Sequence, residues 1–118
     1  MANDFKRFCV PNVGTSLTTL YGVPAGASSA ALESIVIGIT MANKTSTGVV
    51  ASIFIDNEDG TNDVFIVKDA SIPAGASLEV MAGNKLVLQN DGTNGDNLEA
   101  LCSVANSLDV TVSVLEDV

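Results

Sequence analysis

The potentially reactive side chains of this sequence are mainly carboxylates, and several of them lie in one short segment. The segment DNEDGTND at 56–63 contains Asp56, Glu58, Asp59 and Asp63. Carboxylate oxygens are ligands that Ca²⁺ prefers, but the EF-hand pattern requires an Asp where this chain has Ile55. We interpret the segment as a solvated acidic hairpin tip. A looser cation site formed by Asp56, Glu58 and Asp59 stays open as the alternative.

The other reactive residues do not form a catalytic or zinc-binding set. The chain has no His, so neither a Ser-His-Asp nor a Cys-His arrangement has its general base. Its two cysteines, Cys9 and Cys102, lie at opposite ends of the chain without a CxxC pair. We therefore expect no enzyme, no metal and no cofactor. We expect two buried free thiols, with a disulfide between them as the alternative.

The charge of the chain excludes one class of partner. The formal net charge is −9 at pH 7, and the basic residues are scattered over the sequence as Lys6, Arg7, Lys44, Lys68 and Lys85. Such a surface repels phosphate backbones, so we expect no nucleic-acid binding. The N-terminus MANDFKRFCVPNVG lacks the apolar stretch of a secretory signal, and no run reaches the ~20 apolar residues of a membrane helix. We expect synthesis in the host cytoplasm and no membrane contact.

The secondary structure expected to carry these residues consists of strands. Alternating apolar residues predict strands over 17–23, 31–40, 48–56, 62–69, 77–82, 85–90, 97–104 and 108–116. About eight short strands at this spacing are typical of an all-β, antiparallel β-sandwich with jelly-roll or immunoglobulin-like wiring. We expect an N-terminal arm at 1–16 followed by a single β-sandwich domain at 17–118.

Two short strings, each present twice, are predicted to form the connections. PAGAS occurs at 24–28 and 73–77, and Asp-Gly-Thr-Asn occurs at 59–62 and 91–94. Pro at the second position and Gly at the fourth suit a type I turn, so we expect each PAGAS to be a corner that leads into a new strand. We interpret the two halves of the chain as the two sheets of one sandwich.

Several strands are apolar on both faces. In the strand over 31–40, Ile35, Ile37 and Ile39 share one face, and we expect that face to lie in the core. In 48–56 and 62–69 the outward set is expected to be Val50, Phe54, Phe65 and Val67. A two-layer sandwich covers one face of each sheet, so we expect a homo-oligomer to cover this outward set. A covering loop or the N-terminal arm is the alternative.

The N-terminal segment differs from the rest of the chain. Phe5 and Phe8 flank Lys6 and Arg7, the only adjacent basic pair, and Pro11 follows shortly after. We expect an arm that orders on docking, with its cations on an acidic neighbour and its rings in an apolar groove. A plain edge strand is the alternative.

The order of the motifs from residue 21 to residue 116 resembles the small all-β virion proteins of tailed bacteriophages. The shared pieces are YGVPAG, an aliphatic strand, a Ser/Thr/Gly turn, a DGTN hairpin, an IPAG corner and the closing strand LDVTVS. The resemblance implies a non-enzymatic structural protein of the virion. Its preferred form is a capsid decoration or cement protein that binds the major capsid protein or another virion protein, with a trimer favoured at a three-fold site of the shell.

Two other roles stay open at this point. The same resemblance allows a neck, tail or fibre component of the virion. A host-surface or glycan-binding module belongs to a different class, and it needs exposed aromatic platforms that a chain with no Trp and one Tyr offers sparingly.

Overall fold

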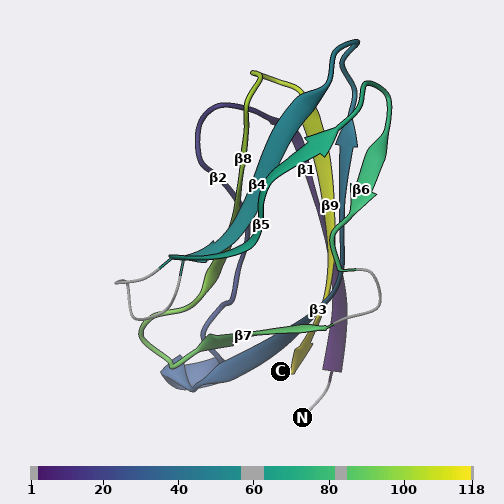
Figure 1. Ribbon diagram of the computed structural model, residues 1–118. Coiled ribbons are helices and arrows are strands. Elements are labelled where there is room, and N and C mark those ends of the chain that lie inside the picture. The colour runs from purple at the N-terminus through teal and green to yellow at the C-terminus, as the bar shows by residue number, and fades with distance from the viewer. Residues whose placement is uncertain (1–2, 57–62, 82–84, 118) are drawn as a thin grey trace.

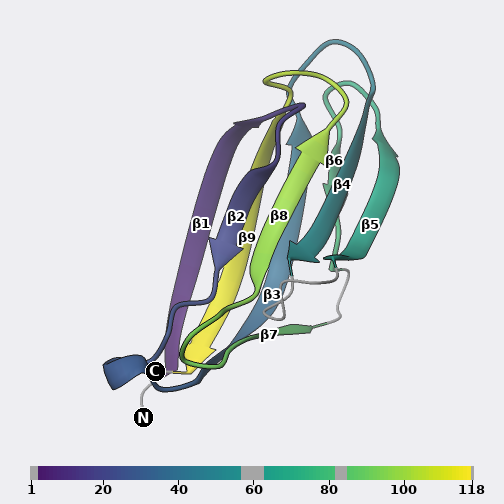
Figure 2. The ribbon, with the colours of Figure 1, turned by 90° about the vertical axis from the view of Figure 1, so that its left-hand side faces the viewer.

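The chain folds into two antiparallel β-sheets that face each other (Figures 1 and 2). The structure, a computed structural model, describes residues 3–56, 63–81 and 85–117. The elements in these residues are β1 (Asn3–Val13), β2 (Thr18–Gly22), the short 3₁₀ turn η1 (Ala27–Ser29), β3 (Leu32–Asn43), β4 (Val49–Asp56), β5 (Asp63–Ile72), β6 (Ser77–Glu79), β7 (Leu86–Asn90), β8 (Asn97–Cys102) and β9 (Leu108–Asp117). The predicted all-β sandwich is confirmed.

The strand pairing is nested and identifies the wiring as a jelly roll. Sheet A has the order β1-β9-β3-β6, with β7 also paired to β3, and sheet B has the order β2-β8-β4-β5. The hairpin β4–β5 is innermost, and β3 with β6 and β7, β2 with β8, and β1 with β9 pair around it. One long two-stranded ribbon is thus rolled into two sheets. The prediction that each half of the chain forms one sheet is wrong, because each nested pair joins an early strand to a late one.

The core between the sheets is built from aliphatic side chains. The buried apolar residues of β3 are Leu32, Val36, Ile39 and Met41, whereas Ile37 is 41% exposed. The pairing of β3 with β9 shifts register between Val36 and Gly38, and this bulge places one extra residue in β3. The expectation that Ile35, Ile37 and Ile39 share the core face is therefore wrong, since the bulge reverses the alternation between Val36 and Ile39.

The first residues form an edge strand of sheet A. Strand β1 pairs with β9 from Asn3 to Val10, and Val13 pairs with Leu108 after a register shift. Both termini lie at the same end of the sandwich (Figure 1). This is the alternative that the sequence analysis left open for residues 1–16, and the predicted boundary with the domain at 17–118 falls in the connection between β1 and β2.

The two PAGAS corners serve the same purpose in the fold. The first leads from β2 to β3 and the second from β5 to β6, so each carries the chain from sheet B to sheet A. A buried asparagine holds each corner at the carbonyl of the residue before Pro. Asn90 Nδ2 donates to Val23 O at 2.8 Å, and Asn43 Nδ2 donates to Ile72 O at 3.0 Å.

The two corners differ in backbone conformation. Ala76 N donates to Pro73 O at 3.1 Å, which places Gly75 third in the turn with φ of +71°. A positive φ at the third position belongs to type II turns, so the predicted type I turn with Gly fourth is wrong here. The first corner continues into η1, where Gly26 N donates to Ala30 O at 2.7 Å.

Gly92 in the β7–β8 connection packs against the first corner, and we expect its replacement to be costly. Its φ is +101°, and a Cβ atom would lie 2.2 Å from the carbonyl oxygen of Ser29. Gly92→Ala should lower the free energy of unfolding by about 2 kcal/mol in urea denaturation, because backbone strain and a backbone clash add. Gly75→Ala is the control, with φ of +71° and open space around it, and should cost about 1 kcal/mol. Equal losses for the two variants would show that the contact with Ser29 does not matter.

Candidate functional site

The outer face of sheet A carries an apolar row that crosses four strands. Phe5 pairs with Leu115, Leu115 pairs with Ile35, and Ile35 pairs with Val87. Directly paired residues project from the same face, so these side chains form one line over β1, β9, β3 and β7. Phe5 is 74% exposed and Val87 is 56% exposed. We call Phe5, Leu115, Ile35 and Val87 the sheet A row.

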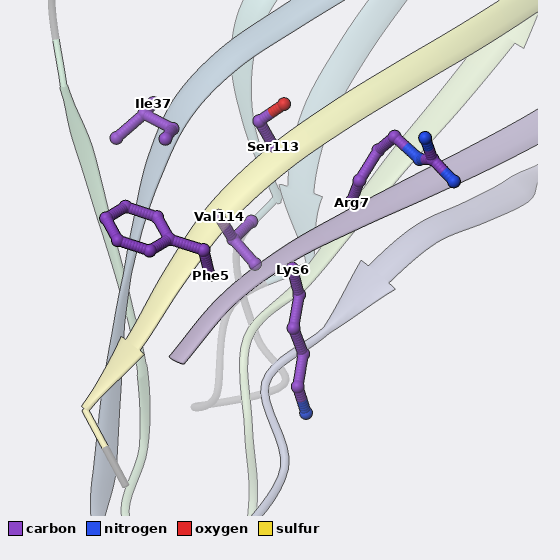
Figure 3. Close-up of a pocket in the computed structure, with 6 residues that line it drawn as sticks. All are labelled: Phe5, Lys6, Arg7, Ile37, Ser113 and Val114. Atoms are coloured by element: carbon purple, nitrogen blue, oxygen red, sulfur yellow. The ribbon is translucent and has the colours of Figure 1, made fainter. Parts of the chain in front are cut away.

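An open pocket of about 260 Å³ lies beside this row. Figure 3 shows the Phe5 ring next to Ile37, with Ser113 and Arg7 on the same side of the sheet and Lys6 pointing away. The exposed Ile37 thus extends the apolar surface, and Arg7 places a positive charge at its border. The pocket is broad and its lining is mainly apolar, which suits a protein contact better than a small polar ligand.

The opposite side of β1 is anchored by a buried polar network. Lys6 Nζ lies 2.9 Å from Oε1 of Glu116, which is buried. The Tyr21 hydroxyl donates to Glu116 Oε2 at 2.5 Å and lies 2.7 Å from Ser34 Oγ. Contact with the Glu116 carboxylate raises the pKa of Lys6. Burial is the main cause that raises the pKa of Tyr21, and the hydrogen bond to Glu116 raises it further.

The four N-terminal residues of the predicted interface therefore divide between two faces. Phe8 is half-buried and packs on Tyr21, with ring centroids 4.9 Å apart, and Lys6 pairs with Glu116. Phe5 and Arg7 are exposed on the outer face of sheet A. Phe8 and Lys6 thus fasten β1 to the sandwich, while Phe5 and Arg7 are available to a partner.

The outer face of sheet B holds a second, smaller apolar surface. Phe54 pairs with Phe65, and their ring centroids lie 5.5 Å apart. Phe65 is 49% exposed and Phe54 only 6% exposed, although Phe54 lies outside the main core cluster. Val50 and Leu101 are half-buried and line the same open pocket in this sheet. We call Phe54, Phe65, Val50 and Leu101 the sheet B patch.

Val67 has a different environment from the other three predicted outward residues. It pairs with Ile53, a core residue, between two register irregularities of the β4–β5 pair. The structure thus brings Val50, Phe54 and Phe65 to one sheet face and does not pair Val67 with any of them.

Two charged residues border the sheet B patch. Glu99 lies on β8, where it pairs with Phe54 of β4, and its carboxylate accepts a hydrogen bond from Thr19 Oγ1. On the other border, Lys68 Nζ lies 5.3 Å from the centre of the Phe65 ring. The patch therefore has an acid on one side and a base on the other.

Other candidate sites from the sequence have these positions. Glu58 and Asp59, on which the looser cation site depends, lie outside the described residues. Both thiols are free; Cys102 is buried against Ser107, but Cys9 is exposed, so the expectation of two buried thiols is wrong for Cys9. The described part of the chain contains no group of three His, Cys, Asp or Glu residues placed to hold a metal ion. It also contains no helix with the length and hydropathy needed to cross a membrane.

Sequence reasoning missed most of the sheet A row. Ile35 was assigned to the core, and Leu115 and Val87 were not singled out. The signal that could have found them is the two-sided apolar pattern, because LESIVIGIT and SVLE also carry apolar residues on both faces. Their alignment across strands depends on pairing register, which the sequence pattern does not contain.

Comparisons with known proteins show the fold of this chain. No protein-family model and no curated protein sequence matches it. A solved structure of Bacillus endospore appendages, described as disulfide-linked pili, matches with a TM-score of 0.51 at 12% identity, covering 97% of this chain and 86% of that one. The VP2 subviral particle of infectious bursal disease virus matches with a TM-score of 0.51 at 15% identity, covering 98% of this chain and 32% of the VP2 chain.

At identities this low, the likeness establishes the architecture alone. This chain spans about a third of the length of the VP2 chain. By their descriptions, one of the similar structures belongs to pili and the other to a subviral particle. The resemblance to proteins of tailed bacteriophages remains a prediction.

Proposed function

We propose that this chain is a non-enzymatic structural protein of a tailed-bacteriophage virion, most specifically a capsid decoration or cement protein. The observation that carries the proposal is the sheet A row, an apolar line across four strands of the jelly roll in which Phe5 and Val87 are exposed and Leu115 and Ile35 are half-buried. A solvent-exposed row of this kind marks a protein contact. The motifs over residues 21–116 supply the virion context.

The proposed partner is the major capsid protein or another virion protein at the outer surface of the shell. Phe5 and the neighbouring Ile37 would contact an apolar groove, and Arg7 would meet a carboxylate at its border. One such contact is small, but many copies on a symmetric shell act together, so that modest affinity per site suffices. Phe8 and Lys6 would hold β1 in place rather than contact the partner.

The place in the virion is tested by copy number. Quantitative mass spectrometry of purified particles should find the chain at hundreds of copies per particle, on the order expected for a protein that repeats over the shell. Tens of copies or fewer would reject decoration and favour the neck, tail or fibre alternative. Particles assembled without the chain should release their DNA at a lower temperature than complete particles.

The host-surface or glycan-binding alternative has less support. Tyr21, the one Tyr of the sequence, is buried and hydrogen-bonded to Glu116, so it offers no stacking platform for a sugar.

A further inference from the structure

The sandwich presents apolar surface on both of its outer faces. The sheet A row is dominated by the exposed Phe5 and Val87, and the sheet B patch by the exposed Phe65. Sheets A and B face each other through the core, so these two surfaces point in opposite directions (Figure 2). A monomer in water would leave both uncovered.

The charges at the two borders are complementary. On sheet A, Arg7 lies on β1 and the exposed Glu33 lies on β3, with β9 between these strands. On sheet B, Glu99 lies on β8 and Lys68 lies on β5, with β4 between these strands. Each surface therefore has one base and one acid that lie two strands apart. Across the strands this corresponds to roughly 10 Å, twice the usual distance between neighbouring strands.

We propose that copies of this chain associate by placing the sheet A row of one copy on the sheet B patch of the next. In this arrangement Phe5 and Ile37 pack against Phe65, while Arg7 faces Glu99 of the second copy. The contact is heterologous, since two different surfaces meet. Because the two surfaces point in opposite directions, a free copy can bind two others, which favours an open series of copies over the closed trimer expected from the sequence. A copy whose sheet A row lies on the shell still presents its sheet B patch, and the sheet A row of a further copy binds there.

The inference rests on the proposed structural role, but it concerns the purified chain and is tested without particles. Phe5→Asp blocks the sheet A row at an exposed residue of an edge strand. Phe65→Asp blocks the sheet B patch. Leu17→Asp is the matched control, because Leu17 is 61% exposed and belongs to neither surface.

Sedimentation analysis over a range of concentrations is the measurement. The wild type and Leu17→Asp should grow in mass with concentration, and each single-face variant should associate at least about tenfold more weakly. An equimolar mixture of Phe5→Asp and Phe65→Asp should form a 1:1 dimer, because each variant supplies the surface that the other lacks. Complementation of this kind requires two different surfaces.

Three results would overturn the proposal: a wild type that stays monomeric at millimolar concentration, a single-face variant that assembles like the wild type, or a mixture that forms no dimer. Since Phe65 packs on Phe54, Glu99→Lys serves as a second sheet B variant, and circular dichroism verifies that every variant is folded. The copy number on particles is a separate observation. A low count would reject decoration and leave the contact between copies standing.

Discussion

Asn43→Ala is expected to lower the free energy of unfolding by about 4 kcal/mol, the largest loss that we predict for a single substitution. The Asn43 side chain is buried at the end of β3, where its Nδ2 faces three carbonyl oxygens. These belong to Thr47, Ile72 and Pro73, at 2.9, 3.0 and 3.2 Å. Removing the amide leaves buried acceptors without donors, and it loosens both the β3–β4 connection and the second PAGAS corner.

Urea denaturation with an unchanged m-value measures this loss. Asn43→Asp distinguishes the loss of the amide donors from the loss of side-chain volume, because the carboxylate has the same size but cannot donate to the carbonyl oxygens. At neutral pH this variant should be at least as destabilising as Asn43→Ala. Asn90→Ala should cost less, because the Asn90 side chain bonds only Val23 O and Gly92 N among the described residues. Asn94→Ala is the control, because Asn94 is exposed and its replacement should leave the free energy of unfolding unchanged. A loss below about 1 kcal/mol for Asn43→Ala would contradict this account.

Tyr21→Phe is expected to cost about 3 kcal/mol, although it removes a single oxygen atom. The Tyr21 hydroxyl donates to Oε2 of the buried Glu116 carboxylate at 2.5 Å. In the Tyr21→Phe variant this oxygen loses that donor while the carboxylate stays buried. Burial of a charge is costly unless hydrogen bonds compensate, so the loss should exceed that of a neutral pair. Ser34→Ala is the control; it leaves the bond from Tyr21 to Glu116 intact and should cost about 1 kcal/mol.

The pH dependence gives a second readout for the same residue. The folded state raises the pKa of Tyr21, so its contribution to stability is present below the unfolded pKa of about 10 and declines as the pH rises further. The raised pKa of the exposed Lys6 acts in the same direction, and it remains in the variant. The difference in unfolding free energy between wild type and Tyr21→Phe should therefore narrow between pH 9 and pH 11. A constant difference across that range would show that Tyr21 does not titrate differently in the folded and unfolded states.

Local patterns in the sequence were enough to predict the class of fold and the approximate positions of the strands from β2 onward, whereas residues 1–16 were expected to form an arm and instead contain β1. Alternation of apolar residues places the strand predicted at 108–116 within one residue of β9, and that predicted at 48–56 within one residue of β4. The two PAGAS corners were also predicted as corners, because Pro and Gly restrict the backbone locally. These features depend on neighbours in the chain, and a single sequence contains that information.

Partner choice between strands required the tertiary structure. The jelly roll pairs β1 with β9 and β2 with β8, across most of the chain length. Nothing in the composition of a strand selects a partner that distant, so the assignment of the halves to separate sheets was wrong. For the same reason Asn43 and Asn90 read as ordinary polar residues, although each is buried against a corner that is remote in the sequence.

The candidate site shows the same division. From the sequence alone it follows that several strands carry apolar residues on both faces, and that Phe5 and Arg7 lie two residues apart near the N-terminus. Which of these apolar residues are exposed depends on the pairing of strands that are distant in the sequence. One inserted residue at Ile37 reverses the faces of β3, and the register of four strands aligns Phe5 with Leu115, Ile35 and Val87. Side-chain direction in a strand has a period of two residues, so a single bulge, set by pairing with a distant strand, determines which residues form the surface.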